Sequence, residues 1–293
     1  MKIFLTGKNG QLGHRLEKDL KQIHEVIATD RDSLDLLDTQ LIKDRVYQAK
    51  PDLIVNAAAY TNVDQAEKEK DLAYKINALA PEALSQAAKA LDIPIIHIST
   101  DYVFDGTKER AYLEDDQVNP LSVYGMTKWQ GEEFVRQAPK HFILRTSWLF
   151  STRGPSFLNT MLKLAKEKYT INMVNDQWGT PTSTKTLVKV IQEIITRLSY
   201  QNLPEIYGTY HVTSNGKTNW YDYSIKILSI FESSKIKILL KKNKVIPISC
   251  KDYSQKACRP LYSVLETKKY RNMFLSEFPD WDKEVENIMQ ELG

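Results

Sequence analysis

The fold class of this chain is decided by the stretch Lys2-Ile3-Phe4-Leu5-Thr6-Gly7-Lys8-Asn9-Gly10-Gln11-Leu12-Gly13. Its apolar run predicts a short buried strand, and Leu12, Leu16 and Leu20 recur at helical spacing beyond it. The three glycines therefore lie in a turn from strand to helix, where they can admit a pyrophosphate and let the helix pack closely. A glycine-rich turn without a ligand would show the same spacing, but the flanking pattern favours a dinucleotide. Cofactor contacts are expected from Gly7, Gly10, Gln11, Leu12 and Gly13.

A second strand is predicted at Val26-Ile27-Ala28, and it ends near Asp30. An acidic residue about twenty positions past the glycines can bind both adenosine ribose hydroxyls, which favours NADH. Arg31 keeps NADPH open, because a guanidinium could instead meet a 2′-phosphate. Asp35 and Leu36 are expected near the adenine.

Small residues follow the next apolar run, which is Leu53-Ile54-Val55. They leave space for a flat ligand against the backbone, although close packing of the chain would also explain them. Cofactor contacts are expected from Ala57, Ala58, Ala59, Tyr60 and Thr61.

Strand and helix patterns alternate four times by residue 100, with one long helix predicted over residues 71–91. This alternation predicts an α/β fold with a doubly wound parallel sheet and helices on both faces. We expect a cofactor-binding domain over residues 1–150 and a smaller α/β domain over residues 151–293. The second domain would mainly bind substrate and could return a strand or helix to the first. In this second half, Pro181 is predicted to open a helix and Thr218 to cap another.

A possible reaction centre follows the apolar strand Ile95–Ile98. Thr100 lies just past its carboxyl end, the edge where open α/β sheets bind ligands. Tyr124 and Lys128 are four residues apart and share one face of a helix. A nearby cation lowers the pKa of a phenol and makes it a better proton donor at neutral pH. The pair alone is weak, since it is common on solvated helix faces, and the upstream pattern is what gives it weight.

Composition excludes several classes of function for these 293 residues. The net charge of +3 is too small to indicate binding of nucleic acid or of an anionic membrane. No apolar run approaches the roughly 18 residues that span a bilayer, and the first residues form a strand instead of a signal peptide. Cys250 and Cys258 have no histidine nearby at metal spacing and are expected to be free thiols. We therefore expect a cytoplasmic protein.

Four motifs together resemble the extended short-chain dehydrogenases/reductases: Gly7-x2-Gly10-x2-Gly13, Asn56-Ala-Ala-Ala59, Ser99-Thr-Asp101 and Tyr124-x3-Lys128. Longer strings are similar to the branch that reduces a 4-keto nucleotide sugar, and the likeness covers essentially the whole chain. They are Ser99-Thr-Asp-Tyr-Val-Phe-Asp-Gly106, Arg145-Thr-Ser-Trp148 and Asn175-Asp-Gln-Trp-Gly-Thr-Pro-Thr182. Dehydratases of the wider family usually carry Glu where this chain has Tyr102, which counts against dehydratase chemistry.

The resemblance implies a Rossmann-type fold and NAD(P)H-dependent reduction of the C4 ketone of dTDP-4-dehydro-L-rhamnose. Tyr124 would donate the proton, Thr100 would hydrogen-bond the carbonyl oxygen, and Lys128 would lower the pKa of Tyr124 and bind the nicotinamide ribose. Tyr124 and Lys128 would thus also contact the cofactor. Arg259 suits a pyrophosphate because its fork binds oxygens in pairs. Substrate contacts are expected from Thr100, Asp101, Tyr124, Trp148, Asn175, Gln177 and Arg259.

Two other activities stay open at this point. One is a reductase or epimerase acting on another nucleotide sugar; the other is a regulatory subunit that binds a dinucleotide without turnover. The expected partner is a small nucleotide-sugar substrate, and the chain could be a monomer or a homodimer. Some relatives form a magnesium-linked dimer through acidic side chains, one of them two residues past the third glycine. Arg15 occupies that position here, so we expect no metal.

Overall fold

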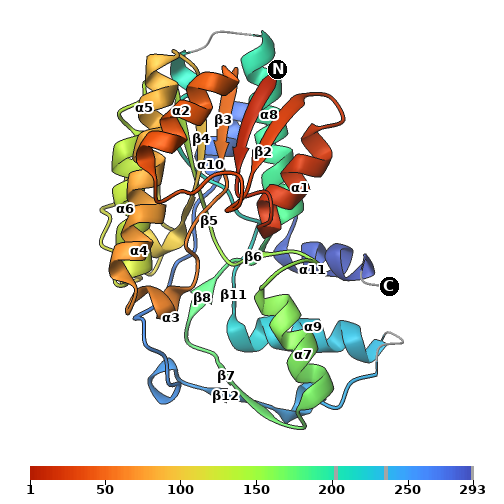
Figure 1. Cartoon of the computed structure of the whole chain (residues 1–293). Coiled ribbons are helices and arrows are strands. Elements are labelled where there is room, and N and C mark those ends of the chain that lie inside the picture. The colour runs from red at the N-terminus through yellow and green to blue at the C-terminus, as the bar shows by residue number, and fades with distance from the viewer. Residues whose placement is uncertain (201–203, 234–236, 292–293) are drawn as a thin grey trace.

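The computed structural model describes residues 1–200, 204–233 and 237–291. Its centre is a six-stranded sheet in the order β10-β5-β4-β3-β1-β2, and every pairing in it is parallel (Figure 1). The strands are β1 (Lys2–Thr6), β2 (Glu25–Thr29), β3 (Leu53–Asn56), β4 (Ile95–Thr100), β5 (His141–Thr146) and β10 (Gly208–His211). The prediction of an α/β fold with a doubly wound parallel sheet is confirmed.

Helices cover both faces of this sheet because the strand side chains alternate between two cores. Ile3 and Leu5 pack with α1 (Gln11–Leu20) and α8 (Thr184–Tyr200), and α10 (Lys268–Phe274) adds Tyr270 to the same core. On the other face, Phe4 packs with α2 (Thr39–Ala49), α5 (Ala80–Ala90) and α6 (Val123–Val135). Asp38 caps α2 by accepting from Leu41 N at 2.9 Å.

The helix predicted over residues 71–91 is interrupted in the structure. It consists of α4 (Lys70–Tyr74), a π-helical turn η1 (Lys75–Leu79) and α5. Pro81 explains the interruption, since proline has no N–H for the carbonyl four residues earlier and its ring clashes with that group. That carbonyl belongs to Asn77, and the wider turn lets α6 approach it closely. A Cβ added to Gly131 would lie 2.1 Å from Asn77 O.

The second half of the chain builds a lower layer and also returns to the main sheet (Figure 1). Three small two-stranded sheets pair β6 (Leu149–Phe150) with β9 (Thr182–Ser183), β7 (Ile171–Val174) with β12 (Val245–Ile248), and β8 (Trp178–Gly179) with β11 (Thr218–Asn219). They surround a core with α7 (Phe157–Glu167), α9 (Trp220–Ser233) and α11 (Trp281–Gln290). Because α8 and β10 belong to the main sheet layer, the two halves share one continuous scaffold.

Two predicted helix starts in this half are wrong. Thr182 and Ser183 pair in β9, so α8 begins at Thr184 and not at Pro181. Thr218 lies in β11, and Asn219 caps α9 instead, accepting from Asp222 N at 2.8 Å. In both places a short strand pairing takes up the residues just before the helix. The remaining short elements are α3 (Val63–Ala66), η2 (Asp101–Val103), η3 (Pro204–Ile206), η4 (Lys242–Lys244) and η5 (Cys250–Asp252). Within the described ranges, no helix combines the length and apolar character needed to cross a membrane.

Candidate active site

The predicted reaction centre lies where β4 ends and α6 begins. Thr100 ends β4 and is paired in register with Thr146 at the end of β5. Ser122 caps α6 by accepting from Gly125 N at 3.2 Å, which places Tyr124 in the first turn of the helix. Gly125 faces the backbone of Tyr102, and only a residue without a side chain fits there. The helix start is thereby held directly against η2.

Thr100 and Tyr124 are brought together in this structure. The Thr100 hydroxyl donates to Asp101 Oδ1 at 3.1 Å and accepts from Tyr102 N at 3.2 Å, and it lies near enough to the Tyr124 phenol to influence the pKa of that group. The rings of Tyr102 and Tyr124 meet edge to face, with centroids 5.9 Å apart. Burial raises the pKa of Tyr124 to about 12, and the interaction with Thr100 opposes that shift. The phenol is therefore fully protonated at neutral pH and can act as a proton donor.

Lys128 lies one turn further along α6 and is 1% exposed. Its Nζ donates to Ile98 O at 2.6 Å and lies 3.3 Å from His97 Nε2. Burial lowers the pKa of Lys128 to about 8, and the charge of Glu132 partly offsets this. The pKa of Tyr124 is raised in this structure and not lowered as expected, because burial is the largest influence on the phenol. The amine is directed at β4, and the burial of the phenol determines its pKa instead.

Asp101 connects the centre to the distant end of the chain. Its carboxyl is 2% exposed, and Ser263 Oγ donates to Oδ2 while Thr100 donates to Oδ1. Burial raises the pKa of Asp101 to about 7, which outweighs the hydrogen bonds. The predicted substrate residue Asp101 thus lies directly behind the Thr100 hydroxyl and is held there by Ser263.

The glycine turn fits a dinucleotide phosphate. Gly7 has a φ of +77°, and a Cβ added to Gly13 would lie 2.1 Å from Gly7 O, so the turn needs glycine at both positions. Gly10 precedes α1 and offers no side chain to its first amides, which leaves them free to receive an anion. Gln11 instead reaches the second half of the chain, donating to Pro155 O at 2.7 Å. The Leu12 side chain is buried in the core, so only its backbone is available to a ligand.

The adenosine end of the predicted site is charged and open. Asp30 follows β2 and accepts from Asn9 Nδ2 at 3.1 Å, while Lys8 Nζ lies 3.1 Å from its Oδ2. Hydrogen bonds from Ser33 and Lys8 hold the pKa of Asp30 well below its ordinary value. Arg31 and Asp35 are exposed, and Leu36 packs partly against the sheet core. The predicted adenosine end of the site therefore carries a negative side chain, Asp30, directly beside a positive one, Lys8.

The small residues after β3 lie beside the glycine turn. A Cβ added to Gly7 would lie 2.9 Å from Ala58, and Ala57 and Ala59 are only half-buried. Tyr60 N donates to Asn77 Oδ1 at 2.8 Å, and Thr61 is exposed. The two predicted cofactor segments thus form one continuous backbone surface.

Trp148 is held in the lower layer, next to the end of β5. It has a φ of +46°, which is unusual for a residue with a side chain, and its ring stacks on Trp220 with centroids 3.5 Å apart. A Cβ added to Gly179 would lie 2.5 Å from the Trp148 ring, so the Gly179 position must stay small. The strained backbone and the stack fix the orientation of this indole.

The other predicted substrate residues differ in their exposure and in their hydrogen-bond partners. Asn175 is exposed, whereas Gln177 is buried and its Nε2 has no hydrogen-bond partner. Arg259 donates to Asp64 Oδ2 at 2.9 Å and to Gln255 Oε1 at 2.8 Å. A pyrophosphate would compete with Asp64 for this guanidinium. The unpartnered amide of Gln177 is the kind of group that a bound polar ligand would satisfy.

Two polar residues were not predicted as site residues: Thr146 at the end of β5 and His97 within β4. Thr146 Oγ1 is buried without a partner beside Thr100, and His97 contacts Lys128. Thr146 could have been found, because it ends the strand that pairs with β4. His97 gave no signal, since a lone histidine in an apolar strand usually belongs to the core.

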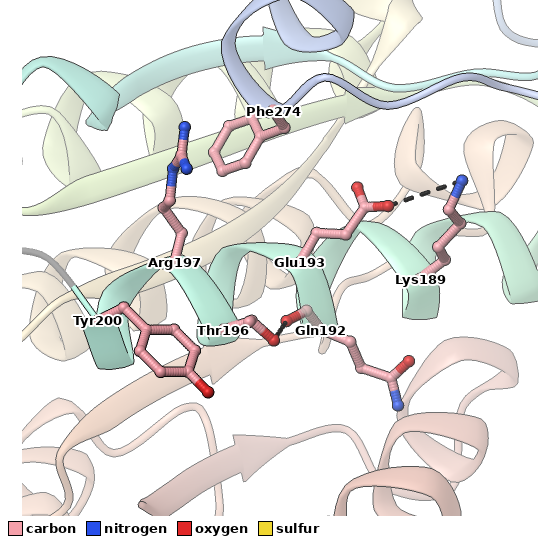
Figure 2. A pocket seen from close by; sticks show the side chains of 7 residues that line it. All are labelled: Lys189, Gln192, Glu193, Thr196, Arg197, Tyr200 and Phe274. Carbon is pink, nitrogen blue, oxygen red and sulfur yellow. Dashed lines mark hydrogen bonds and ion pairs between the residues drawn. The ribbon is translucent and has the colours of Figure 1, made fainter.

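A separate groove of about 420 Å³ runs along the outer side of α8, with Phe274 at its edge (Figure 2). Lys189 and Glu193 lie along it and form an ion pair at 3.6 Å. None of the predicted site residues lines this groove. Arg15 lies elsewhere and pairs with Asp19 at 3.0 Å. In the part of the chain that the structure describes, no group of three or more His, Cys, Asp or Glu side chains is arranged to hold a metal ion.

The sheet is parallel, with a glycine turn at the end of one strand. The end of a neighbouring strand carries a buried Thr and Lys and a half-buried Tyr. These features define a Rossmann-type protein with the polar groups of a carbonyl reductase. The comparisons narrow this class, and the resemblance seen in the sequence is confirmed. Residues 1–293 match the family described as RmlD substrate binding domain. The chain belongs to this family.

Similar proteins agree over the full length. The dTDP-4-dehydrorhamnose reductase of Escherichia coli (strain K12) is 39% identical over 297 residues, which covers 100% of this chain and 98% of that protein. The crystal structure of a dTDP-4-dehydrorhamnose reductase from Clostridium acetobutylicum has a TM-score of 0.90 at 38% identity, covering 100% and 99% of the two chains. The enzyme from Bacillus anthracis str. Ames, solved in complex with NADP, has a TM-score of 0.90 at 35% identity, covering 99% of each chain.

Proposed function

We propose that this chain reduces the C4 ketone of dTDP-4-dehydro-L-rhamnose to dTDP-L-rhamnose with NADPH or NADH. The observation that carries the proposal is the placement of the Thr100 hydroxyl, at the carboxyl end of β4, next to the Tyr124 phenol in the first turn of α6. The names of the full-length relatives support the choice of substrate. The NADP bound to the Bacillus anthracis enzyme supports the choice of cofactor.

The residues that would hold the cofactor lie along one edge of the sheet. The Gly7, Gly10 and Gly13 turn with its uncapped helix start would receive the pyrophosphate, and Asp30 with Lys8 would meet the adenosine ribose. The backbone after β3, from Ala57 to Thr61, would line the cofactor between these ends. When bound, the reduced nicotinamide supplies the hydride for the carbonyl carbon.

The chain's own groups handle the proton and the developing charge. When the ketone binds, the Thr100 hydroxyl would redirect its hydrogen from Asp101 to the carbonyl oxygen, and this contact strengthens as negative charge grows there. Tyr124 would donate its proton to that oxygen, since burial keeps the phenol protonated at neutral pH. The charged form of Lys128 would stabilise the phenolate that remains after Tyr124 has given up its proton. Before the ketone binds, Asp101, which is fixed by Ser263, would accept the hydrogen bond of the Thr100 hydroxyl and hold that side chain in place.

Substrate contacts are proposed for residues of both halves. Trp148 would offer a ring face to the hexose, Gln177 would use its unpartnered amide, and Arg259 would bind the pyrophosphate after release from Asp64. Asn175 and Asp101 complete this proposed set. On this view residues 1–150 bind mainly cofactor and residues 151–293 mainly substrate, even though the second part contributes α8 and β10 to the main sheet.

The setting of the protein is also part of the proposal. Two free cysteines fit a reducing compartment, and we place the enzyme in the cytoplasm, where it would act as a monomer or homodimer without a metal. An enzyme is favoured over a regulatory dinucleotide-binding subunit, because such a subunit needs no phenol, hydroxyl and amine at one strand end.

A coupled assay tests the proposal. The keto sugar is made in situ, NADPH or NADH is added, and absorbance at the nicotinamide band is followed with several other nucleotide 4-keto sugars as comparison substrates. Consumption with dTDP-4-dehydro-L-rhamnose that exceeds every comparison supports the assignment. A faster reaction with another sugar would show that this other sugar is the substrate. No consumption of NADPH or NADH with any of the sugars would refute the proposed reductase activity.

A further inference from the structure

Three neighbouring strands place polar side chains in one buried row. Thr6 on β1 is in register with Asn56 on β3, and Asn56 is in register with His97 on β4. These side chains are 0%, 2% and 0% exposed. Lys128 of α6 touches the end of this row at His97 Nε2. A polar row this deep is costly unless every member is paired, so the direction of each hydrogen bond can be worked out.

The amide of Asn56 has one orientation that satisfies its neighbours. Ala58 N carries a hydrogen and can only donate, and it lies 3.3 Å from Asn56 Oδ1. The Thr6 hydroxyl donates to the same oxygen at 2.7 Å. With Oδ1 accepting on this side, the NH2 group of Asn56 faces His97, where Nδ2 lies 3.0 Å from Nδ1. Asn56 is therefore the donor to the histidine ring.

This donor fixes the tautomer of His97. Because Nδ1 accepts from Asn56, a neutral ring must carry its proton on Nε2. Burial keeps the ring neutral, holding the pKa of His97 well below its ordinary value. The proton on Nε2 faces Lys128 Nζ at 3.3 Å, and this Nζ donates to Ile98 O at 2.6 Å. An amine in this position accepts from one neighbour and donates to the other.

Building on the proposed function, we propose that His97 is a positioning residue for Lys128. Held in the Nε2–H tautomer by Asn56, it presents a ring N–H to Lys128 Nζ and sets the pH at which Lys128 gains its charge. An N–H directed at an ammonium is unfavourable, whereas the same N–H stabilises the neutral amine. His97 thus holds Lys128 close to the pH at which its amine gains or loses a proton.

The other charged groups around Lys128 act in the opposite direction or are neutralised. Glu132 on α6 favours the ammonium, but it is paired with Arg145 of β5 and with Arg136. His97 is the titratable group that contacts Lys128 from β4. Loss of the His97 N–H should therefore raise the pKa of Lys128. In the proposed reaction kcat/KM falls at high pH as Lys128 loses its proton, and we call this fall the alkaline limb of the pH profile. Without the His97 N–H the alkaline limb should therefore move to higher pH.

Ring-nitrogen NMR of protein labelled with ¹⁵N-histidine tests the tautomer without any turnover. Two-bond correlations distinguish an Nε2–H ring from an Nδ1–H ring, and the His97 signals are identified by their loss in His97→Asn. We expect a neutral ring with its proton on Nε2 from about pH 6 to about pH 9. An Nδ1–H ring, or a ring that becomes charged in this range, would overturn the proposal. If the wild-type enzyme reduces no keto sugar, the proposed function fails, and the tautomer result is still decisive for His97.

Matched variants test the effect on Lys128 through the pH dependence of kcat/KM. His97→Asn keeps a polar group toward Asn56 but removes the one that faces Lys128, and its alkaline limb should move up by about one pH unit, the size of one lost buried hydrogen bond. His97→Gln restores an amide N–H in reach of Lys128 and should keep the limb near its original place. His211→Asn is the control, because His211 is equally buried but contacts Tyr112 and Arg145 instead. The proposal would be contradicted if the alkaline limb of His97→Asn did not move, or if that of His211→Asn moved by the same amount. If His97→Asn does not fold, a shift of the alkaline limb in His97→Gln would contradict the proposal instead.

Discussion

A Cβ atom on Gly125 would lie 2.2 Å from the carbonyl oxygen of Tyr102, so the first turn of α6 rests directly on the backbone that follows β4. This contact sets the distance between Thr100, which precedes Tyr102, and Tyr124, which precedes Gly125. The backbone on both sides belongs to regular elements and cannot yield as a flexible side chain would.

Gly125→Ala should therefore lower turnover by roughly a hundredfold, since a shift of about 1 Å in a catalytic group can cost that much. The control is Met126→Ala, because Met126 is the next residue of α6 and is exposed. Steady-state kinetics and a thermal melt would be measured for both variants. Normal turnover in folded Gly125→Ala would show that α6 does not need this contact.

Glu132 is expected to carry much of the stability of the region. It is fully buried, pairs with Arg145 through Nη2 at 2.7 Å and accepts from Ser99. Glu132→Gln leaves the Arg145 charge buried without a counter-charge, which should cost about 3–5 kcal/mol of unfolding free energy. Glu133→Gln is the control: Glu133 also pairs with Arg136, but at the surface, so less than about 1 kcal/mol is expected. Urea unfolding at neutral pH measures both, and equal losses would refute the buried-pair argument.

Asp101 should make the stability depend on pH. Its pKa is raised from 3.8 to about 7 by burial, so between these values the folded chain holds a proton that the unfolded chain has lost. This contribution is present at low pH and is lost as the pH rises toward about 7. In the wild-type chain the free energy of unfolding should fall by about 1.4 kcal/mol per pH unit between the unfolded and folded pKa values of Asp101. In Asp101→Asn this fall should be flattened, because the amide does not titrate. Denaturant midpoints of the wild-type chain and of Asp101→Asn, measured at about pH 5 and about pH 8, test this prediction. The same change in midpoint with pH for both proteins would contradict it.

Lys8 and Asp30 should shift the cofactor preference in opposite directions. Their side chains are 3.1 Å apart at the proposed adenosine site, so each charge moderates the other. Lys8→Gln leaves the carboxylate to repel a 2′-phosphate and should favour NADH by roughly fivefold. Asp30→Asn should favour NADPH by a similar factor. Dissociation constants for both cofactors, measured by fluorescence titration, test the pair, and a shift in the same direction for both variants would place the adenosine elsewhere.

Much of the cofactor edge could be predicted because its signals are local. The turn at Gly7, the small residues at Ala58 and the strand ends all follow from short patterns, and the parallel sheet then brings their ends together. The π-helical turn was also readable in principle, since Pro81 leaves the Asn77 carbonyl without a donor. Thr146 was available to the same reasoning that selected Thr100.

Other features depend on contacts between distant residues and leave no trace in a single sequence. The pairing of Arg259 with Asp64 joins residues 195 positions apart. A strand returning from the second half was expected, but its place at the edge of the sheet beside β5 depends on a pairing between distant residues. The i, i+4 spacing placed Tyr124 and Lys128 on one helix face but could not show that the Lys128 amine turns toward Ile98 O. The pKa expected for the phenol was therefore in the wrong direction.

The central claim is that the Tyr124 phenol donates the proton in the reduction. Tyr124→Phe removes the hydroxyl and keeps the ring that packs on Tyr102, so its kcat in the coupled assay is the most direct measurement. The account predicts a fall of at least about two orders of magnitude, with NADPH bound as tightly as by the wild-type chain. Turnover near the wild-type value in this variant would contradict it.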